Sequence, residues 1–409
     1  MRYVIIGNSV AAAGCIAGIR QQDPQGEITV IGKEPYGAYS RPLISYLLQG
    51  KTDLVRMRYR PDAFYQEHGC VMRLGETASA IDQAQKQVRL EQGEVLPYDK
   101  LLVATGSRPF IPPTEGLEEV EQRFTFMTLD DALTLAQALT PQSRVLILGA
   151  GLIGLKCAEA IYEKTGNITV VDLASRILSS VLDEAGATRM QRHLEGKGIS
   201  FVLGDSVARF QGGRAKLQKG GELPFDILVE AVGVRPETGL VAQAGGKVER
   251  GIVTGLYGET SLPDVYAAGD CAQCHDVSSG TDRVLALLPN AYLQGHCAGV
   301  HMAGGDCAPR PLLPMNATGL LGLHMITAGS YQGQDLVMED EASYKRLFFE
   351  DDKLKGYILI GDVERAGIYT ALIREGTPLS SIDFELIAKR PQLMAFQKAD
   401  RMKKLGGIG

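Results

Sequence analysis

A strand, a glycine turn, a helix and a second strand follow one another twice in this chain, and this order constrains the fold most. In the clearer copy, an apolar strand runs from Arg144 to Leu148 and ends at the turn Gly149–Gly154. A helix is expected over 154–164, and a strand over Ile168–Val171 ends at Asp172. A helix between two strands makes them parallel, with both faces of the sheet covered. The pattern therefore predicts an α/β fold.

The turn of this copy has the chemistry of a dinucleotide site. Its first glycine permits a tight turn, its second lets backbone approach a pyrophosphate, and its third allows close helix–strand packing. Asp172, 23 positions after Gly149, can accept hydrogen bonds from a ribose diol and would repel a 2′-phosphate. NADH is therefore favoured over NADPH, although a plain glycine turn with an exposed Asp is the alternative. The residues expected to bind NAD are Gly149, Gly151, Leu152, Ile153, Gly154, Asp172 and Gly233.

The other copy opens the chain and has a weaker turn. A strand over Tyr3–Ile6, a helix over Ala11–Arg20 and a strand over Ile28–Ile31 are expected around a turn with one glycine, Gly7. Small residues replace the other two glycines and still leave room for a phosphate. Glu34, just past the second strand, is placed to bind a ribose. A second nucleotide unit is predicted.

Size, charge and cysteine usage narrow the class further. A chain of 409 residues is long for one hydrophobic core and suggests two or three domains. A net charge of −6 does not suggest a nucleic-acid binder, and no apolar run reaches the roughly 18 residues of a membrane span. The chain enters a strand at once, without a targeting signal, and its seven cysteines are unevenly spaced. A cytoplasmic protein without a metal site is expected.

Two further motifs carry a resemblance to a known family. Tyr98–Gly106 reads YDKLLVATG and Thr260–Asp270 reads TSLPDVYAAGD, on either side of the NAD unit. With them, nearly the whole chain resembles the FAD/NAD(P)-dependent pyridine nucleotide-disulfide oxidoreductases, which include glutathione, rubredoxin and ferredoxin reductases. The resemblance implies two Rossmann-like domains with FAD in the first unit. It also implies that Asp270 hydrogen-bonds the ribityl–phosphate part of FAD.

Within that family the chain is similar to the NADH-rubredoxin reductase and nitrite reductase flavoprotein branch. Tyr39–Ser45, reading YSRPLIS, resembles a segment in which the arginine, here Arg41, reaches FAD. Leu288 to about Met302 is expected to be a helix whose N-terminus points at the flavin in relatives. The residues implied to bind FAD are Gly7, Ser9, Ala11, Ala12, Lys33, Glu34, Arg41, Ala78, Ala104, Thr105, Gly106, Gly269, Asp270, Pro289 and Asn290.

The same resemblance implies the domain plan. An FAD domain is expected at 1–112 and 239–308, an NAD domain at 113–238, and a C-terminal α+β interface domain at 309–409. In the last, strands are signalled at 346–349 and 357–360 with a turn over 350–355 between them. Such domains often support assembly, so a homodimer or a larger complex is expected there.

Cysteine positions bear on the route of electrons. No cysteine falls between Cys15 and Cys70, where disulfide reductases of this family carry a redox pair, so a thiol relay is not expected. Cys271 and Cys274 form a C-x-x-C directly after Asp270, and buried thiols are favoured over a redox pair or half a zinc site. The other cysteines are expected in the core on helices.

Lys156 is the residue predicted to influence catalysis. It stands early in the NAD-unit helix, where the family pattern has a glutamate, while Tyr46 stands where ferredoxin-reductase relatives have a partner lysine. The hypothesis is that Lys156 places a positive charge near the flavin ring. A solvated lysine on a helix is the alternative.

These expectations combine into one reaction and two alternatives. Hydride passes from NADH to FAD, and electrons then pass to a rubredoxin- or ferredoxin-type iron–sulfur protein, with a link to carbon monoxide dehydrogenase as one route. The alternatives are an NADH oxidase that uses oxygen and a flavoprotein subunit of a larger redox complex. The basic tail Lys389–Lys404 offers a contact for an acidic iron–sulfur protein, although a solvated helix face explains it more simply.

Overall fold

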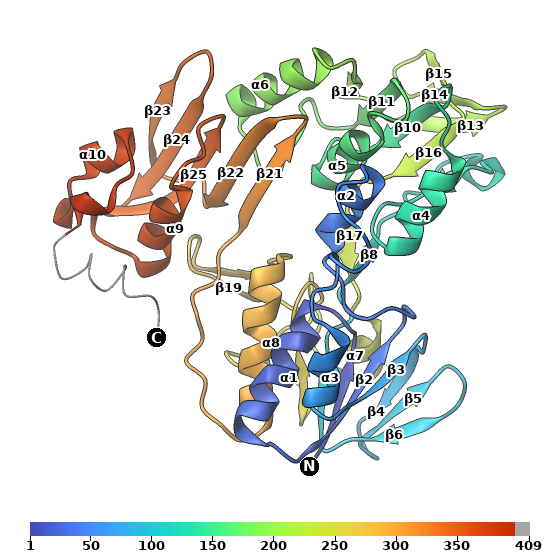
Figure 1. Ribbon diagram of the computed structural model, residues 1–409, viewed down its shortest axis with the longest axis vertical. Helices are drawn as coiled ribbons and strands as arrows, with labels where there is room; N and C mark the ends of the chain where they lie inside the picture. Colours follow the sequence, from blue (N-terminus) through green and yellow to red (C-terminus); the bar gives the residue numbers. More distant parts are fainter. Residues whose placement is uncertain (397–409) are drawn as a thin grey trace. The chain divides into compact units, whose positions relative to one another are not determined.

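The computed structural model describes residues 1–396 (Figure 1). They form two compact units, of which the first contains 1–178, 194–274 and 282–310, and the second contains 179–193, 275–281 and the chain from 311 onward. Residues 397–404, the second half of the basic tail from Lys389 to Lys404, lie outside the described residues. Both parallel sheets fall in the first unit, so the boundary expected between the FAD and NAD domains stays a prediction.

A parallel sheet at the start of the chain forms the framework of the first nucleotide unit. Its strand order is β18-β7-β1-β2-β3, and every neighbouring pair is parallel. Helix α1 joins β1 to β2, and α8 packs against α1 (Figure 1). The bounds are β1 Arg2–Ile6, α1 Val10–Gln22, β2 Glu27–Gly32, β3 Cys70–Leu74, β7 Lys100–Val103, β18 Val265–Ala267 and α8 Leu288–Met302.

Helices α1 and α8 pack so closely that the backbone of one lies against the backbone of the other. A Cβ added at Gly14 or Gly18 of α1, or at Gly295 or Gly299 of α8, would lie 2.0–2.3 Å from a backbone oxygen of the other helix. Only glycine fits at such positions, because any side chain would push the helices apart. This packing fixes the position of α8 against the first sheet.

The second parallel sheet has the order β12-β11-β10-β16-β9. One of its faces is covered by an antiparallel meander, where Phe210 and Phe225 pack with Leu146 and Leu228. Helix α5 runs from Leu152 to Ile161 and not over the predicted 154–164. It starts two residues early because Gly151 is its N-cap, and it ends three residues before the predicted end. The bounds are β9 Arg123–Phe124, α4 Leu129–Ala138, β10 Arg144–Leu148, β11 Asn167–Asp172, α6 Glu184–Glu195, β12 Ser200–Leu203, β13 Val207–Gln211, β14 Arg214–Leu217, β15 Glu222–Pro224 and β16 Ile227–Glu230.

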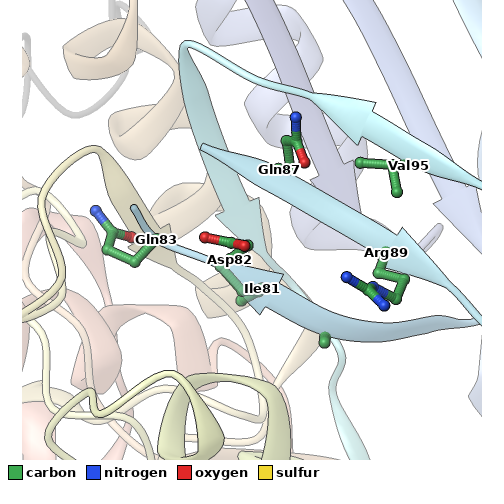
Figure 2. Close-up of a pocket in the computed structure, with 7 residues that line it drawn as sticks. Ile81, Asp82, Gln83, Gln87, Arg89 and Val95 are labelled. Carbon is green, nitrogen blue, oxygen red and sulfur yellow. The ribbon is translucent and has the colours of Figure 1, made fainter. Parts of the chain in front are cut away.

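Smaller elements complete the first unit. Strands β8 and β17 form a two-stranded antiparallel ribbon, and β4, β5 and β6 form a second meander. An open hollow of about 410 Å³ lies on that meander. Figure 2 shows the side chains that line it, among them Asp82, Gln87 and Arg89. None of its lining residues is one expected to bind a nucleotide. The bounds are α2 Ile44–Leu48, α3 Asp62–Glu67, β4 Ala78–Asp82, β5 Gln87–Leu90, β6 Val95–Pro97, β8 Ser107–Pro109, β17 Val234–Pro236 and α7 Gly239–Gln243.

The second unit contains a five-stranded antiparallel sheet of order β21-β22-β25-β24-β23, with α9 packed against it. The turn predicted over 350–355 is wrong in length: Glu350 pairs with Lys353, and Asp351 and Asp352 turn the chain alone with φ of 49° and 59°. The bounds are β21 Met315–Leu320, β22 Leu323–Gly329, β23 Gln334–Glu339, β24 Tyr344–Glu350, β25 Lys353–Ile360, α9 Ala366–Glu375 and α10 Phe384–Lys389.

The predicted fold class is confirmed. Two parallel sheets with helical crossovers precede an α+β unit, as expected from the repeated pattern. Among residues 1–396, none of the helices combines the length and apolar character needed to cross a bilayer.

Candidate functional site: two glycine-lined nucleotide cradles

The three glycines after β10 have different surroundings that match their expected roles. A Cβ on Gly149, whose φ is +104°, would lie 2.3 Å from the Ala231 oxygen, and one on Gly154 would lie 2.0 Å from the Gly149 oxygen. Gly151, at the N-cap of α5, instead faces open space. The outer two glycines are therefore needed for packing, while the middle one leaves backbone accessible to a phosphate at a helix N-terminus.

Asp172 lies at the end of β11 beside this turn. One carboxylate oxygen accepts a hydrogen bond from the Ala150 amide at 2.6 Å, and the other accepts from the Ala174 amide at 2.7 Å. Leu152 and Ile153 are half-buried at the start of α5, and Gly233 follows β16 with a φ of +119°. The structure therefore holds a negative charge over the glycine turn, where a ribose diol would find an acceptor.

The first cradle repeats the geometry with one glycine. A Cβ on Gly7, whose φ is +113°, would lie 2.0 Å from the oxygen of Ala104 at the end of β7. Ser9 is the N-cap of α1, and Ala11 and Ala12 are buried in its first turn. Small side chains thus keep the N-terminus of α1 approachable, as the sequence predicts.

The structure places the side chains of Glu34 and Arg41 in contact, and nothing in the sequence pattern predicts this pair. The Glu34 carboxylate accepts hydrogen bonds from the Tyr39 hydroxyl at 2.6 Å and from the Arg41 guanidinium. Arg41 also donates to the Met127 oxygen at 3.1 Å. The neighbouring Lys33 is exposed. Glu34 and Arg41 therefore form one ion pair beside the cradle.

Asp270, Gly269 and Ala78 lie in the first unit together with the first cradle. Burial raises the pKa of the Asp270 carboxyl, while the Arg41 charge and the Ser107 side chain act in the opposite direction. The Gly269 amide donates to the side chain of Gln294 on α8 at 2.8 Å, which links the Asp270 loop to this helix. Ala78 lies on β4 of the meander and packs against the core cluster that contains Ile6 and Val103 of the parallel sheet.

Four remaining positions lie just after β7 and at the start of α8. Thr105 donates to the Glu237 oxygen at 2.6 Å, and the next residue, Gly106, has a φ of +71°. Pro289 occupies the first turn of α8, where no amide donor is lost, and Asn290 is buried beside it. The Arg41 guanidinium and the backbone amides at the N-terminus of α1 are hydrogen-bond donors of the kind that bind a pyrophosphate.

Two contacts of Lys156 bear on its predicted role. Its ammonium forms an ion pair with Glu159 and lies 4.9 Å from the ring centroid of Tyr46 on α2. The contact joins α5, which follows the NAD turn, to the chain segment that carries Arg41. The Glu159 partner was missed, although its spacing of three residues on a helix is a recognisable signal.

None of the cysteines in the described chain takes part in a disulfide. Cys271 is buried, and burial raises the pKa of its thiol. Cys274 is half-buried, and the Gln294 amide donates to its sulfur at 3.2 Å. The expectation that all other cysteines lie on helices is wrong for Cys70, which is on β3, and for Cys307, which follows α8.

No grouping of metal-ligating side chains suited to an ion occurs within residues 1–396. The candidate site consists of two glycine-lined cradles, three carboxylates, one arginine, and Lys156 with its partners Glu159 and Tyr46. The carboxylates are Glu34, Asp172 and Asp270, and the arginine is Arg41.

Comparison with known proteins identifies the family. Residues 1–295 match the pyridine nucleotide-disulphide oxidoreductase family, and residues 314–377 match the rubredoxin NAD⁺ reductase C-terminal domain. The chain belongs to the pyridine nucleotide-disulphide oxidoreductase family. It is an NAD(P)H-dependent oxidoreductase with FAD as its cofactor, and the two cradles suit these two dinucleotides.

Named relatives fall in the predicted branch. The chain is 30% identical over 400 residues to subunit epsilon of NADH-dependent phenylglyoxylate dehydrogenase of Aromatoleum evansii, covering 95% of this chain and 94% of that one. It is 33% identical over 373 residues to the assimilatory nitrate reductase electron transfer subunit of Bacillus subtilis (strain 168). That match covers 88% of this chain but only 48% of the relative, so the chain spans about half of that relative's length.

A third relative and a solved structure complete the comparison. Rubredoxin-NAD⁺ reductase of Pseudomonas putida is 28% identical over 341 residues, with 82% of this chain and 88% of the relative covered. The reductase in a covalent putidaredoxin reductase–putidaredoxin complex superposes with a TM-score of 0.87 at 23% identity, covering 95% of this chain and 96% of that chain. The structural likeness shows the fold.

Proposed function

We propose that this chain transfers hydride from NADH to FAD and passes electrons on to a small iron–sulfur protein of rubredoxin or ferredoxin type. The observation that carries the proposal is the contact of Lys156 with Tyr46, because it joins the helix of the NAD cradle to the segment beside the FAD cradle. Bound FAD can accept a hydride and release electrons singly, while the protein supplies position and charge. The two cradles hold the nucleotides, and Asp172 favours NADH over NADPH.

The choice of acceptor rests on the relatives and on the sequence. Relatives at 28–32% identity carry the names rubredoxin-NAD⁺ reductase, probable ferredoxin reductase and ferredoxin–NAD⁺ reductase component. The stretch between Cys15 and Cys70 offers no thiol for a disulfide relay. Electrons then leave the cofactor directly. A ferredoxin-like partner of carbon monoxide dehydrogenase belongs among the acceptors to test, and a cytoplasmic location stays a prediction.

Anaerobic stopped-flow spectroscopy tests this function. The FAD-loaded protein is mixed with NADH or NADPH, and the reduced sample is then mixed with rubredoxin, ferredoxin or air-saturated buffer. Fast reduction by NADH and fast reoxidation only by an iron–sulfur protein is the expected result. Fast reoxidation by air alone would instead indicate an NADH oxidase.

A second candidate function is that of an electron-entry subunit in a larger enzyme. The near full-length match to a dehydrogenase subunit from A. evansii favours it. Purification from the native host followed by native mass spectrometry separates the cases. Co-purification with other redox chains would support a subunit, and a homodimer or monomer that reduces free iron–sulfur protein would support a stand-alone reductase. We propose that 309–409 provides the assembly surface in either case.

We also propose that Lys156 adjusts the reduction potential of bound FAD. The Lys156 side chain is 18% exposed and lies beside Tyr46, so water screens its charge less than that of an exposed lysine, although Glu159 offsets part of it. Lys156→Met leaves the Glu159 carboxylate without this cation and should lower the potential by about 30 mV, or about 1.4 kcal/mol for two electrons. Potentiometric titration measures the shift.

Lys164→Met removes an exposed lysine just beyond the same helix and is the matched control. Equal potentials in Lys156→Met and the wild type would reject this role for Lys156.

A further inference from the structure

One tyrosine joins the segment beside the first cradle to a helix next to the second parallel sheet. Helix α4 follows β9 and precedes β10, and both strands belong to the sheet that carries the NAD cradle. The Leu129 amide, at the first position of α4, donates to the Tyr39 hydroxyl at 2.9 Å. That hydroxyl donates in turn to the Glu34 carboxylate at 2.6 Å. A carboxylate implied to bind FAD is thus linked to α4 through a single hydroxyl.

The chemistry of the partners fixes the direction of these two hydrogen bonds. A backbone amide can only donate and a carboxylate accepts, so the single proton of the Tyr39 hydroxyl points to Glu34. The Arg41 guanidinium also donates to this hydroxyl, at 3.3 Å. Tyr39 is 8% exposed, and burial raises the pKa of its hydroxyl, which therefore keeps its proton at neutral pH. Each bond that the hydroxyl accepts strengthens the one that it donates.

The backbone around Tyr39 is held independently of its hydroxyl. The Ser40 amide donates to the Met57 oxygen at 2.8 Å, and the Tyr59 amide donates to the Ala38 oxygen at 2.8 Å. Loss of the hydroxyl should therefore leave the backbone of this segment in place. The effect of such a loss would be confined to the hydrogen bonds that the hydroxyl itself makes.

Two other side chains of the same segment also reach the start of α4. Arg41 donates to the oxygen of Met127, two residues before the helix, at 3.1 Å. The Tyr36 hydroxyl donates to the Asp130 carboxylate at 2.6 Å, in an exposed contact. Neither Tyr36 nor Asp130 is expected to bind a nucleotide. This second tyrosine contact is therefore a matched control for the first.

We propose that the Tyr39 hydroxyl is a positioning group that couples FAD bound in the first cradle to helix α4. The inference rests on the proposed placement of FAD in that cradle. Ribose hydroxyls that donate to Glu34 hold its carboxylate where Tyr39 can donate to it, while the Leu129 amide holds the hydroxyl from the other side. The coupling is reciprocal, because contacts that hold α4 in place also favour bound FAD. Changes at the start of α4 should consequently alter how tightly FAD is held.

The rate of FAD release from the loaded full chain tests this coupling. Loaded protein is diluted into buffer without FAD, and the appearance of free FAD is followed by fluorescence. Tyr39→Phe removes the whole link and should speed release about tenfold. Leu129→Pro removes only the amide donor, because proline suits the first position of a helix and Thr128 before it is already extended. This variant should speed release about threefold.

Three further variants separate coupling from packing. Leu129→Ala keeps the amide but trims the same buried side chain, and it should release FAD at the wild-type rate. Tyr36→Phe should also leave the rate unchanged. The double variant of Tyr39→Phe with Leu129→Pro should release FAD no faster than Tyr39→Phe alone, because both changes break the same link.

Three results would overturn the proposal. They are wild-type release in Leu129→Pro, equal release in Leu129→Ala and Leu129→Pro, and effects that multiply in the double variant. Reduction of the wild type by NADH and its reoxidation by an iron–sulfur protein judge the proposed function separately. Failure of either step with the expected pattern of FAD release would count against that function alone.

Discussion

Gly149 and Gly151 lie two positions apart, yet the structure separates their roles. A methyl group on Gly149 meets the Ala231 oxygen at 2.3 Å at a φ of +104°, whereas one on Gly151 meets open space. Gly149→Ala should lower the free energy of unfolding by about 1–3 kcal/mol. Gly151→Ala should leave stability unchanged and weaken NADH binding about tenfold, since it fills the place where phosphate approaches.

Thermal unfolding and NADH titration of both variants check this pair. Equal loss of stability in the two would mean that the middle glycine is also a packing residue.

Asp172 is predicted to select between the two nicotinamide dinucleotides. Asp172→Ser removes the charge that repels a 2′-phosphate and should move the preference toward NADPH by about tenfold, equivalent to about 1.4 kcal/mol. The ratio of apparent dissociation constants for NADH and NADPH measures it. Asp205 also accepts amide hydrogen bonds, from Ser206 at 2.8 Å and Lys219 at 3.2 Å, so Asp205→Asn is the control. If both variants changed the ratio alike, the selection would not reside in Asp172.

At the scale of elements, β16 ends in a buried acid that the cradles do not explain. The Glu230 side chain is 1% exposed, and the Arg123 Nε atom lies 3.8 Å from one of its oxygens. Within the described residues, neither carboxylate oxygen has a hydrogen-bond partner. Burial raises the pKa of Glu230, although Arg123 acts in the opposite direction. The neutral acid is therefore favoured in the folded state.

This buried acid predicts a pH dependence of stability. Because its folded pKa lies above the ordinary 4.5, its contribution is fully present below pH 4.5 and is lost as pH rises through the folded value. Glu230→Gln, which stays neutral, should raise the melting temperature at about pH 8 and lose this advantage below pH 4.5. Glu118→Gln, at an exposed site, should show no such crossover. A constant difference at every pH would contradict the assignment.

Prediction from sequence succeeded where local signals were strong. The strands at Arg2–Ile6 and Arg144–Leu148 are continuous apolar runs that end at a glycine, so their positions were predicted to within a residue. Strand β23 was missed because its residues are mostly exposed and carry no apolar pattern. The pair of Glu34 with Arg41 depends on how a loop folds back, which spacing along the chain cannot show.

At the scale of the whole molecule, a segment from the middle of the chain belongs to the second unit. The Asp183 carboxylate accepts hydrogen bonds from the Tyr344 hydroxyl and, at 2.8 Å, from Arg346, and Tyr331 donates to the Val181 oxygen at 2.7 Å. Nothing local in residues 179–193 indicates this, because the contacts join positions about 150 residues apart. The domain plan read from the sequence placed the whole segment in the NAD domain.

Asp183→Ala should therefore weaken the second unit selectively. The carboxylate also accepts from the Gly186 amide at 2.9 Å, so three hydrogen bonds are lost, and the loss should cost about 1–3 kcal/mol. Hydrogen exchange should rise in β24 and in 179–193, with reduction of FAD by NADH unchanged. Asp335→Ala removes the other acidic partner of Arg346, at a more exposed position, and should have a smaller effect. Faster exchange spread evenly over the first unit as well would contradict this assignment.

The close crossing of α1 and α8 determines how mutational tolerance will be distributed along the chain. In a saturation mutagenesis screen, Gly14, Gly18, Gly295 and Gly299 should rank with the cradle glycines among the least replaceable positions. From sequence data alone, such a ranking would suggest that these four glycines bind a ligand. The structure shows instead that they pack one helix against the other. Substitutions at these glycines should be poorly tolerated because the two helix backbones are so close. Variants designed for a new electron acceptor should therefore keep all four glycines.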